Sequence, residues 1–292
     1  MQYAHGGDIY TYKNLLDFSI NVNPLGPADA VVEAAARSLQ RIGEYPDSQS
    51  RELRNALAEK KGLAAEQFVI GNGAADLLFS LVLAEKPQKA MIVIPAFSEY
   101  EQALKTVGCE ILYHEVKKEN NFRLGTDLTE KITSELDFLF LCSPSNPAGQ
   151  AVEKEFLIKI AEKCEKERVR LVLDECFVQF LTSGEEASMQ LETGRKEDHR
   201  EEQTRQLVKS ERERMEKELE NLRIEYIPSE ANFLLFNSEI NWFEELKKRG
   251  ILIRDCANYR GLGNGWYRMA VRLPEENDRL LECMKQVLNE RS

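Results

Sequence analysis

The 292-residue sequence predicts an α/β protein with a mostly parallel sheet, followed by a small α+β region at the C-terminal end. Apolar runs of strand length recur through the first part of the chain and alternate with segments of helical spacing. Such alternation is typical of parallel sheets with helices on both faces. One long, charged helical run then separates this part from a second set of shorter strands and helices.

The apolar runs of the first part predict five strands. Continuous apolar runs of this length fit strands that are buried on both faces. The strands are expected at "FVI" (68–70), "AMIVI" (90–94), "EILYHEV" (110–116), "FLFLC" (138–142) and "RLVL" (170–173). The segments "AADLLFSLVLAEK" and "KEFLIKIAEKCEKE" between them have the spacing of helices.

Residues 195–222 form a charge-laced run whose few apolar positions fall on one helical stripe. At ~1.5 Å per residue this helix would be roughly 40 Å long, enough to connect two domains. Strands at "IEYIP", "NFLLF", "GILIR" and "WYRMAVR" and helices at about 239–249 and 275–290 follow. We therefore expect an N-terminal arm (1–30), a large domain (31–194), the connecting helix (195–222) and a small α+β domain (223–292).

Composition narrows the classes of function. The net charge of −11 argues against a nucleic-acid partner, since such affinity is built from clustered Lys and Arg. No signal peptide and no window of ~20 apolar residues is found, so we expect neither export nor a membrane partner. Six scattered cysteines without a CxxC pair indicate a reduced, cytoplasmic compartment. The three histidines are too dispersed for a metal site, and none is predicted.

Three motifs at predicted strand ends carry candidate ligand contacts. In "GNGAADLLF" (71–79) a glycine turn leads into a helix, whose N-terminal N–H groups can hold a phosphate or can belong to an ordinary turn. Phe97 of "PAFSEY" can lie against a planar ring or in the core. Asn146 of "CSPSNPAGQ" can donate to a ligand oxygen or can simply start the turn.

The fourth motif, "LVLDE" (171–175), places Asp174 at the C-terminal end of a predicted strand, where α/β proteins bind ligands. An unpaired carboxylate at a sheet edge costs several kcal/mol unless it finds a cation or hydrogen-bond donors. A phosphate-binding turn, an aromatic ring, an amide and a carboxylate thus follow one another at successive strand ends. Together they predict a pocket for a flat, phosphorylated, protonated heterocycle.

This set of motifs resembles the fold-type I pyridoxal-phosphate (PLP) aminotransferases, within them the histidinol-phosphate aminotransferase and threonine-phosphate decarboxylase group. The resemblance extends over nearly the whole chain. Further matches are "HGGDIY" (5–10), "DFSINVNPLGP" (17–27), "EYPD" (44–47), "PSEANFLLF" (228–236), "GILIRDCANYRGLG" (250–263) and "YRMAVR" (267–272).

The resemblance implies a PLP-transferase-like large domain and a role for each motif around PLP. Asp174 would pair with the protonated pyridine nitrogen, Asn146 would meet the ring hydroxyl and Phe97 would stack on the ring. The cofactor phosphate would lie on the backbone of Gly73, Ala74 and Ala75. Tyr45 would reach the phosphate of the neighbouring subunit's cofactor, which implies a homodimer.

The resemblance also implies a site for a phosphorylated amino acid. Arg268 would hold the substrate carboxylate as a planar fork. The other implied substrate residues are Arg272, Arg254, His5 and Asn23. Two alternatives stay open: Arg272 can instead pair with Glu275 or Glu276, and His5 can belong to a flexible arm.

Two departures from the family pattern bear on activity. Phe177 stands where aminotransferases of this group carry Tyr, which favours the decarboxylase-like branch. The Ser-x-x-Lys segment with the Schiff-base lysine is absent, so no catalytic residue is identified and the large domain is predicted to be truncated internally. The loss amounts to about two βαβ units of ~30 residues each, near Met189–Leu191. Lys196 is a poor replacement because its charged, solvated surroundings would not lower its pKa.

The sequence therefore predicts a PLP-dependent decarboxylase or aminotransferase by resemblance. Its function is most like that of a threonine-phosphate decarboxylase of cobalamin-type biosynthesis. The alternatives are a histidinol-phosphate aminotransferase of histidine biosynthesis, or a catalytically dead binding or scaffold protein that lacks the lysine segment.

Overall fold

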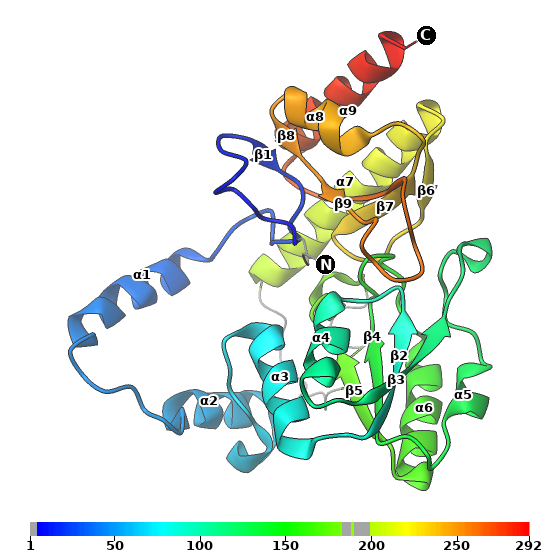
Figure 1. Ribbon diagram of the computed structural model, residues 1–292. Helices are drawn as coiled ribbons and strands as arrows, with labels where there is room; N and C mark the ends of the chain where they lie inside the picture. The colour runs from blue at the N-terminus through cyan, green and yellow to red at the C-terminus, as the bar shows by residue number, and fades with distance from the viewer. Residues whose placement is uncertain (1–4, 183–187, 190–198, 292) are drawn as a thin grey trace.

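The computed structural model describes residues 5–182, 188–189 and 199–291 (Figure 1). Two four-stranded sheets organise these residues. The N-terminal parallel sheet lies in the lower half of Figure 1, and the C-terminal sheet lies in the upper half.

The N-terminal sheet has the strand order β3-β2-β4-β5, and all of its neighbours are parallel. Four of the five strands predicted for this part are therefore confirmed. They are β2 (Lys89–Ile94), β3 (Glu110–Glu115), β4 (Phe138–Cys142) and β5 (Arg170–Asp174). In the register of the last pair, Cys142 lies opposite Asp174 at the C-terminal edge.

Helices cover both faces of this sheet, as the alternation of strands and helices predicts. Alternate strand residues point to opposite faces. On one face Ile92 and Phe140 pack under α3 (Gly73–Glu85) and α4 (Ser98–Thr106). On the other face, residues such as Met91 and Leu139 pack against α5 (Leu128–Lys131) and α6 (Lys154–Glu167).

The strand predicted at 68–70 is wrong. These residues follow the 3-10 turn η2 (Ala65–Gln67) as an irregular segment, and the Val69 side chain is 75% exposed. A strand needs a neighbour to pair its backbone groups, and no described strand runs beside this segment. The apolar run alone therefore did not specify a strand.

The C-terminal region is α+β, as expected. Its sheet has the order β6-β7-β10-β9 and is antiparallel throughout. The strands are β6 (Glu225–Ile227), β7 (Phe233–Asn237), β9 (Arg254–Asp255) and β10 (Trp266–Ala270). Helices α7 (His199–Asn221), α8 (Trp242–Lys248) and α9 (Pro274–Asn289) contribute Met215, Trp242 and Leu280 to its core.

A short parallel pair joins the N-terminal segment to this region. Strand β1 (Leu16–Asp17) pairs with β8 (Ile251–Leu252), and Phe18 is buried in the C-terminal core. Residues 16–18 thus pack on the C-terminal region, although they precede the parallel sheet in the sequence.

An arm leaves the body between these two parts (Figure 1). It comprises α1 (Asp29–Ser38), the 3-10 turn η1 (Leu39–Arg41) and α2 (Arg51–Lys61), and none of these elements buries a residue. Several large apolar side chains are exposed along it: Val31, Val32, Leu39, Ile42, Tyr45 and Leu53. At its root, Arg200 of α7 donates from Nη2 to the carbonyl oxygens of Leu25 at 2.6 Å, and of Gly26 and Pro27 at 3.1 Å each.

Two short 3-10 turns, η3 (Lys118–Asn120) and η4 (Val178–Phe180), complete the described elements. No helix in the described part of the chain is long and apolar enough to cross a membrane.

Candidate functional site

Asp174 ends β5 with its carboxylate held from two sides. The Tyr100 hydroxyl donates to Oδ2 at 2.6 Å, and the backbone N–H of Cys176 donates to Oδ1 at 2.9 Å. The residue is only half-buried, so a ligand can still reach it. A carboxylate oxygen accepts more than one hydrogen bond, and Asp174 therefore keeps capacity for a ligand donor.

Phe97 and Asn146 lie at the same edge of the sheet. Phe97 follows β2 and directly precedes α4, and its ring meets that of Tyr100 edge to face at 5.9 Å. Asn146 lies in the loop after β4. Since β2, β4 and β5 are neighbours in the sheet, the side chains that follow them share one edge.

The N-terminal end of α3 presents free backbone donors. The first N–H groups of a helix have no acceptor within it, which applies here to Gly73, Ala74 and Ala75. Gly73 has φ of +84°, a conformation that favours glycine. Asp76 caps the turn by accepting from the Asn72 N–H at 2.8 Å. This helix end is suited to a phosphate.

Asp174, Phe97 and Asn146 form what we call the strand-end cluster, and Arg268 of β10 reaches it from the C-terminal region. Its Nη1 donates to Asn146 Oδ1, and its Nη2 donates to the Ser19 carbonyl oxygen at 3.0 Å. Arg268 is buried, and its Nε has no partner among the described residues. The Tyr259 hydroxyl also reaches Asn146 Oδ1, at 3.4 Å. A buried guanidinium N–H without an acceptor fits an anionic ligand.

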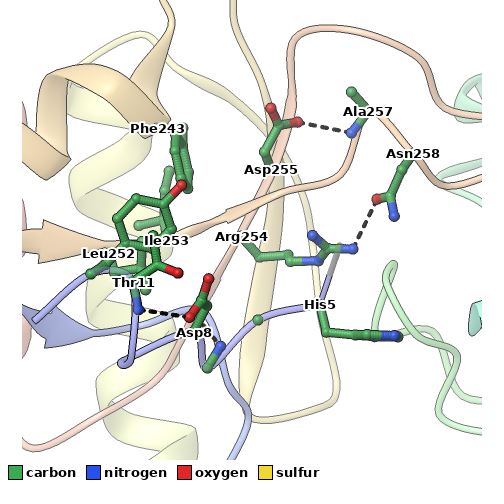
Figure 2. Close-up of a pocket in the computed structure, with 14 residues that line it drawn as sticks. His5, Asp8, Thr11, Phe243, Leu252, Ile253, Arg254, Asp255, Ala257 and Asn258 are labelled. Atoms are coloured by element: carbon green, nitrogen blue, oxygen red, sulfur yellow. Dashed lines mark hydrogen bonds between the residues drawn. The ribbon is translucent and has the colours of Figure 1, made fainter. Parts of the chain in front are cut away.

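A cavity of about 750 Å³ is lined by residues of the N-terminal segment 5–19 and of the C-terminal region (Figure 2). His5 and Arg254 both line it. Arg254 donates from Nη2 to Asn258 Oδ1 at 2.8 Å, and its guanidinium lies over the Tyr259 ring at 5.4 Å. The His5 Nε2 atom is 3.1 Å from Oε1 of the buried Glu99. Two of the predicted substrate residues thus share one cavity.

The remaining predicted residues lie elsewhere. Arg272 forms a two-point ion pair with Glu276, at 3.0 Å from Nε and 2.9 Å from Nη2, and its Nη1 donates to the Asp17 carbonyl oxygen. Glu276 is one of the two structural partners that the sequence offers. Asn23 donates to Thr204 Oγ1 at 3.1 Å and lines a separate cavity of about 260 Å³. Tyr45 is fully exposed on the arm.

Sequence reasoning missed the hydroxyl of Tyr100. The signal was its spacing, because Tyr100 lies three residues after Phe97 on one helical face in "PAFSEY". Burial raises the pKa of Tyr100 well above its ordinary value, and burial likewise raises the pKa of the neighbouring Cys142 thiol. Both groups therefore keep their protons and bring no charge to Asp174.

Glu175 holds the chain where the sequence places the internal loss. Its Oε2 accepts from Ser188 Oγ and its Oε1 accepts from the Met189 N–H, both at 2.7 Å. Leu191 and Lys196 lie outside the described residues. Met189 is thus the last described residue before the predicted junction.

The parallel sheet with helices on both faces, the acid at the end of β5 and the antiparallel C-terminal sheet are the features of a PLP-transferase fold. More particularly, the chain belongs to the aminotransferase class I and II family, whose model matches residues 13–199. Enzymes of this family depend on PLP, so the predicted family and cofactor are confirmed.

Two curated relatives are similar over most of the chain. A threonine-phosphate decarboxylase of Salmonella typhimurium is 31% identical over 351 residues, covering 98% of this chain and 96% of that protein. Histidinol-phosphate aminotransferase 1 of Archaeoglobus fulgidus is 30% identical, covering 94% and 99%. The first alignment exceeds the 292 residues of this chain by 59 positions, so at least that many positions have no counterpart here. This difference agrees with the predicted internal truncation.

Solved structures show the same fold. Histidinol-phosphate aminotransferase from Clostridium acetobutylicum superposes with a TM-score of 0.83 at 22% identity, covering 94% of this chain and 100% of that one. L-threonine-O-3-phosphate decarboxylase from Porphyromonas gingivalis superposes with a TM-score of 0.73 at 19% identity, with the same coverage.

Proposed function

We propose that this chain binds PLP at the strand-end cluster and acts on a phosphorylated amino acid, most like a threonine-phosphate decarboxylase. The observation that carries this proposal is the buried Arg268, which contacts Asn146 and has an Nε without a partner among the described residues. A carboxylate is the anion that a planar guanidinium recognises at two points. The names of the two curated relatives point to the same substrate class.

The cluster fits the cofactor group by group. Asp174 would hold the proton on the pyridine nitrogen, the side-chain amide of Asn146 would donate to the ring hydroxyl, and Phe97 would lie against the ring. The N–H groups of Gly73, Ala74 and Ala75 would hold the phosphate. When bound, PLP supplies an electron-withdrawing ring that stabilises negative charge at the substrate Cα.

The substrate would lie between Arg268 at one end and Arg254 with His5 at the other. Arg268 would hold the carboxylate beside the cofactor, while Arg254 and His5 would bind the phosphate in the 750 Å³ cavity. Arg272 and Asn23 have protein partners outside this cavity, and we assign both to the architecture of the C-terminal region.

The chain's own residues favour decarboxylation over transamination. Transamination needs a base that moves a proton from Cα, whereas loss of the carboxylate does not. None of the described hydrogen bonds of Asp174, Asn146 or Arg268 is made with a lysine. Histidinol-phosphate transamination is the second candidate, because a relative at 30% identity has that name. A binding protein without catalysis is the third, because the lysine segment is absent from the sequence.

We further propose a cytoplasmic homodimer. None of the six cysteines forms a disulfide, as expected for a reducing compartment. Val32, Ile42 and Tyr45 expose apolar surface along an arm that buries nothing in its own subunit, and a second copy would cover it. Tyr45 is then free to reach the partner's cofactor.

A PLP titration tests the site. We expect Asp174→Asn to weaken binding by ~1.5–3 kcal/mol, because a neutral amide cannot hold the pyridinium proton. Asp127→Asn, at the exposed residue that directly precedes α5, is the matched control and should bind like the parent chain. Equal affinities of all three proteins would remove Asp174 from the site.

Reaction products separate the three candidate functions. Release of CO₂ from phosphothreonine supports the decarboxylase, and conversion of histidinol phosphate with a keto acid supports the aminotransferase. A covalent adduct after borohydride reduction shows that an amine of the protein bonds to PLP. PLP binding with neither product nor adduct identifies a binding protein. Inserting a family-type Ser-x-x-Lys segment between Met189 and Leu191 should then restore the adduct, if the remaining pocket is intact.

A further inference from the structure

Tyr100 is buried deeply beneath the strand-end cluster. The side chain, on α4, is 1% exposed. Its ring stacks on Phe140 of β4 with centroids 5.4 Å apart and meets Phe97 edge to face. A phenylalanine would fill this apolar space equally well, so packing does not account for the hydroxyl.

The hydroxyl has a specific partner. A buried hydroxyl costs free energy unless it forms a hydrogen bond, and Tyr100 donates to Asp174 Oδ2 at 2.6 Å. Because burial raises the pKa of Tyr100, the hydroxyl keeps its proton and remains a donor. The side chain of Tyr100 thus connects the helix under Phe97 to the acid at the end of β5.

The two donors to Asp174 fix the carboxylate without neutralising it. Tyr100 binds one oxygen and the Cys176 N–H binds the other, which restrains rotation of the carboxylate plane. Both donors are neutral, whereas a lysine or arginine in the same place would cancel the negative charge. The full charge is therefore left for a cation that approaches from the open side.

We propose that Tyr100 is a positioning residue that holds the Asp174 carboxylate in place for the ring nitrogen of PLP. The proposal rests on the function inferred above and adds a residue to that site. Tyr100 acts through Asp174 and does not itself touch the cofactor.

The test compares Tyr100→Phe with Tyr113→Phe, a matched loss of a hydroxyl on β3. We expect Tyr100→Phe to weaken PLP binding by roughly 3- to 10-fold, the usual range for one lost hydrogen bond. The absorption spectrum of the bound PLP should also shift toward the form with an unprotonated pyridine, at a pH where the parent and Tyr113→Phe keep the protonated form. Loss of ring packing alone would not change the protonation of the ligand.

A double-mutant cycle ties both effects to Asp174. In an Asp174→Asn background, Tyr100→Phe should no longer change the affinity or the spectrum. An unchanged affinity and spectrum for Tyr100→Phe alone, or the same losses in both backgrounds, would overturn the proposal.

Measurements on the ligand-free protein distinguish a failure of the proposed function from a failure of the role proposed for Tyr100. If the parent chain does not bind PLP, the proposed function fails, and unfolding equilibria still test the contact. The effects of Tyr100→Phe and Asp174→Asn on the unfolding equilibrium constant should then deviate from a simple product by roughly threefold or more. A simple product would show that Tyr100 does not hold Asp174.

Discussion

The edge strand β5 of the parallel sheet and the central strands of the C-terminal sheet differ in how completely the chain covers them. All five residues of β10 are buried, and so are four of the five in β7. In β5, by contrast, Arg170 is exposed and the other four residues are only half-buried, although "LVL" is as apolar as the core of β7. Strand β5 is the edge of its sheet. An apolar run becomes a buried strand only when the chain supplies neighbours on both sides.

Matched leucine truncations measure this difference directly. Leu234→Ala in the C-terminal core should lower the free energy of unfolding by ~2–5 kcal/mol, because Leu234 is fully buried. Leu173→Ala in β5 should cost roughly half as much, since its side chain is already partly in water. Leu139→Ala, at the buried centre of the parallel sheet, is the control and should resemble Leu234→Ala. Urea unfolding gives all three values, and equal losses for Leu173 and Leu234 would contradict the comparison.

The variant Arg272→Ala tests whether the ion pair with Glu276 stabilises the C-terminal region. Losing the two-point contact with Glu276 and the bond to the Asp17 carbonyl should cost about 1–2 kcal/mol of stability. The affinity for phosphothreonine should not change, because Arg272 does not line the cavity. The exposed Arg279→Ala on α9, the helix that carries Glu276, is the control for stability. A selective loss of phosphothreonine binding, with threonine unaffected, would return Arg272 to the phosphate site.

Glu101 forms an ion pair that links the two regions, and the contribution of this pair to stability depends on pH. Arg260, from the loop before β10, donates to Glu101 of α4 at 2.9 and 3.0 Å. This contact is the main reason why the pKa of Glu101 is lowered to about 2, from an ordinary value of 4.5. The carboxylate form is therefore favoured by folding, so its contribution is complete above pH 4.5 and is lost as the pH falls toward 2.

Glu101→Gln should remove this part of the acid dependence. The free energy of unfolding of Glu101→Gln should fall less between pH 5 and pH 2 than that of the parent. Glu130→Gln on α5 is the control and should show the same fall as the parent. An unchanged acid dependence in Glu101→Gln would show that the link between the regions contributes no stability.

The smallest effect is expected at Val69. This side chain is exposed, so Val69→Ser should change the free energy of unfolding by no more than ~0.5 kcal/mol. Thermal unfolding of the dilute protein measures it. A loss above ~1 kcal/mol would show that this segment is covered after all, as the apolar run "FVI" predicts.

Local patterns predicted most of the fold, because strand-length apolar runs and helical spacing are properties of short segments. The strand predicted at 68–70 is wrong because strand pairing depends on a neighbour that is distant in sequence. At the site, the resemblance to the family named Asp174, Asn146 and Arg268, and their roles stay predictions. The contact between Arg268 and Asn146 spans 122 residues, and the Tyr100 hydroxyl meets Asp174 across 74. Such contacts depend on the assembled sheet, which no local pattern contains.

The hydrogen bonds from Arg200 to three successive carbonyl oxygens fix the base of the arm. The arm therefore acts as a lever whose fulcrum is this point. The helical turns from Asp29 to Arg41 extend roughly 20 Å at ~1.5 Å per residue. A tilt of ~10° at the fulcrum therefore moves the far end by roughly 3 Å, about the length of one hydrogen bond. Arg200 lies in the first turn of α7. The position of Arg200 on α7 thus sets the angle of the lever, and with it the place of Tyr45.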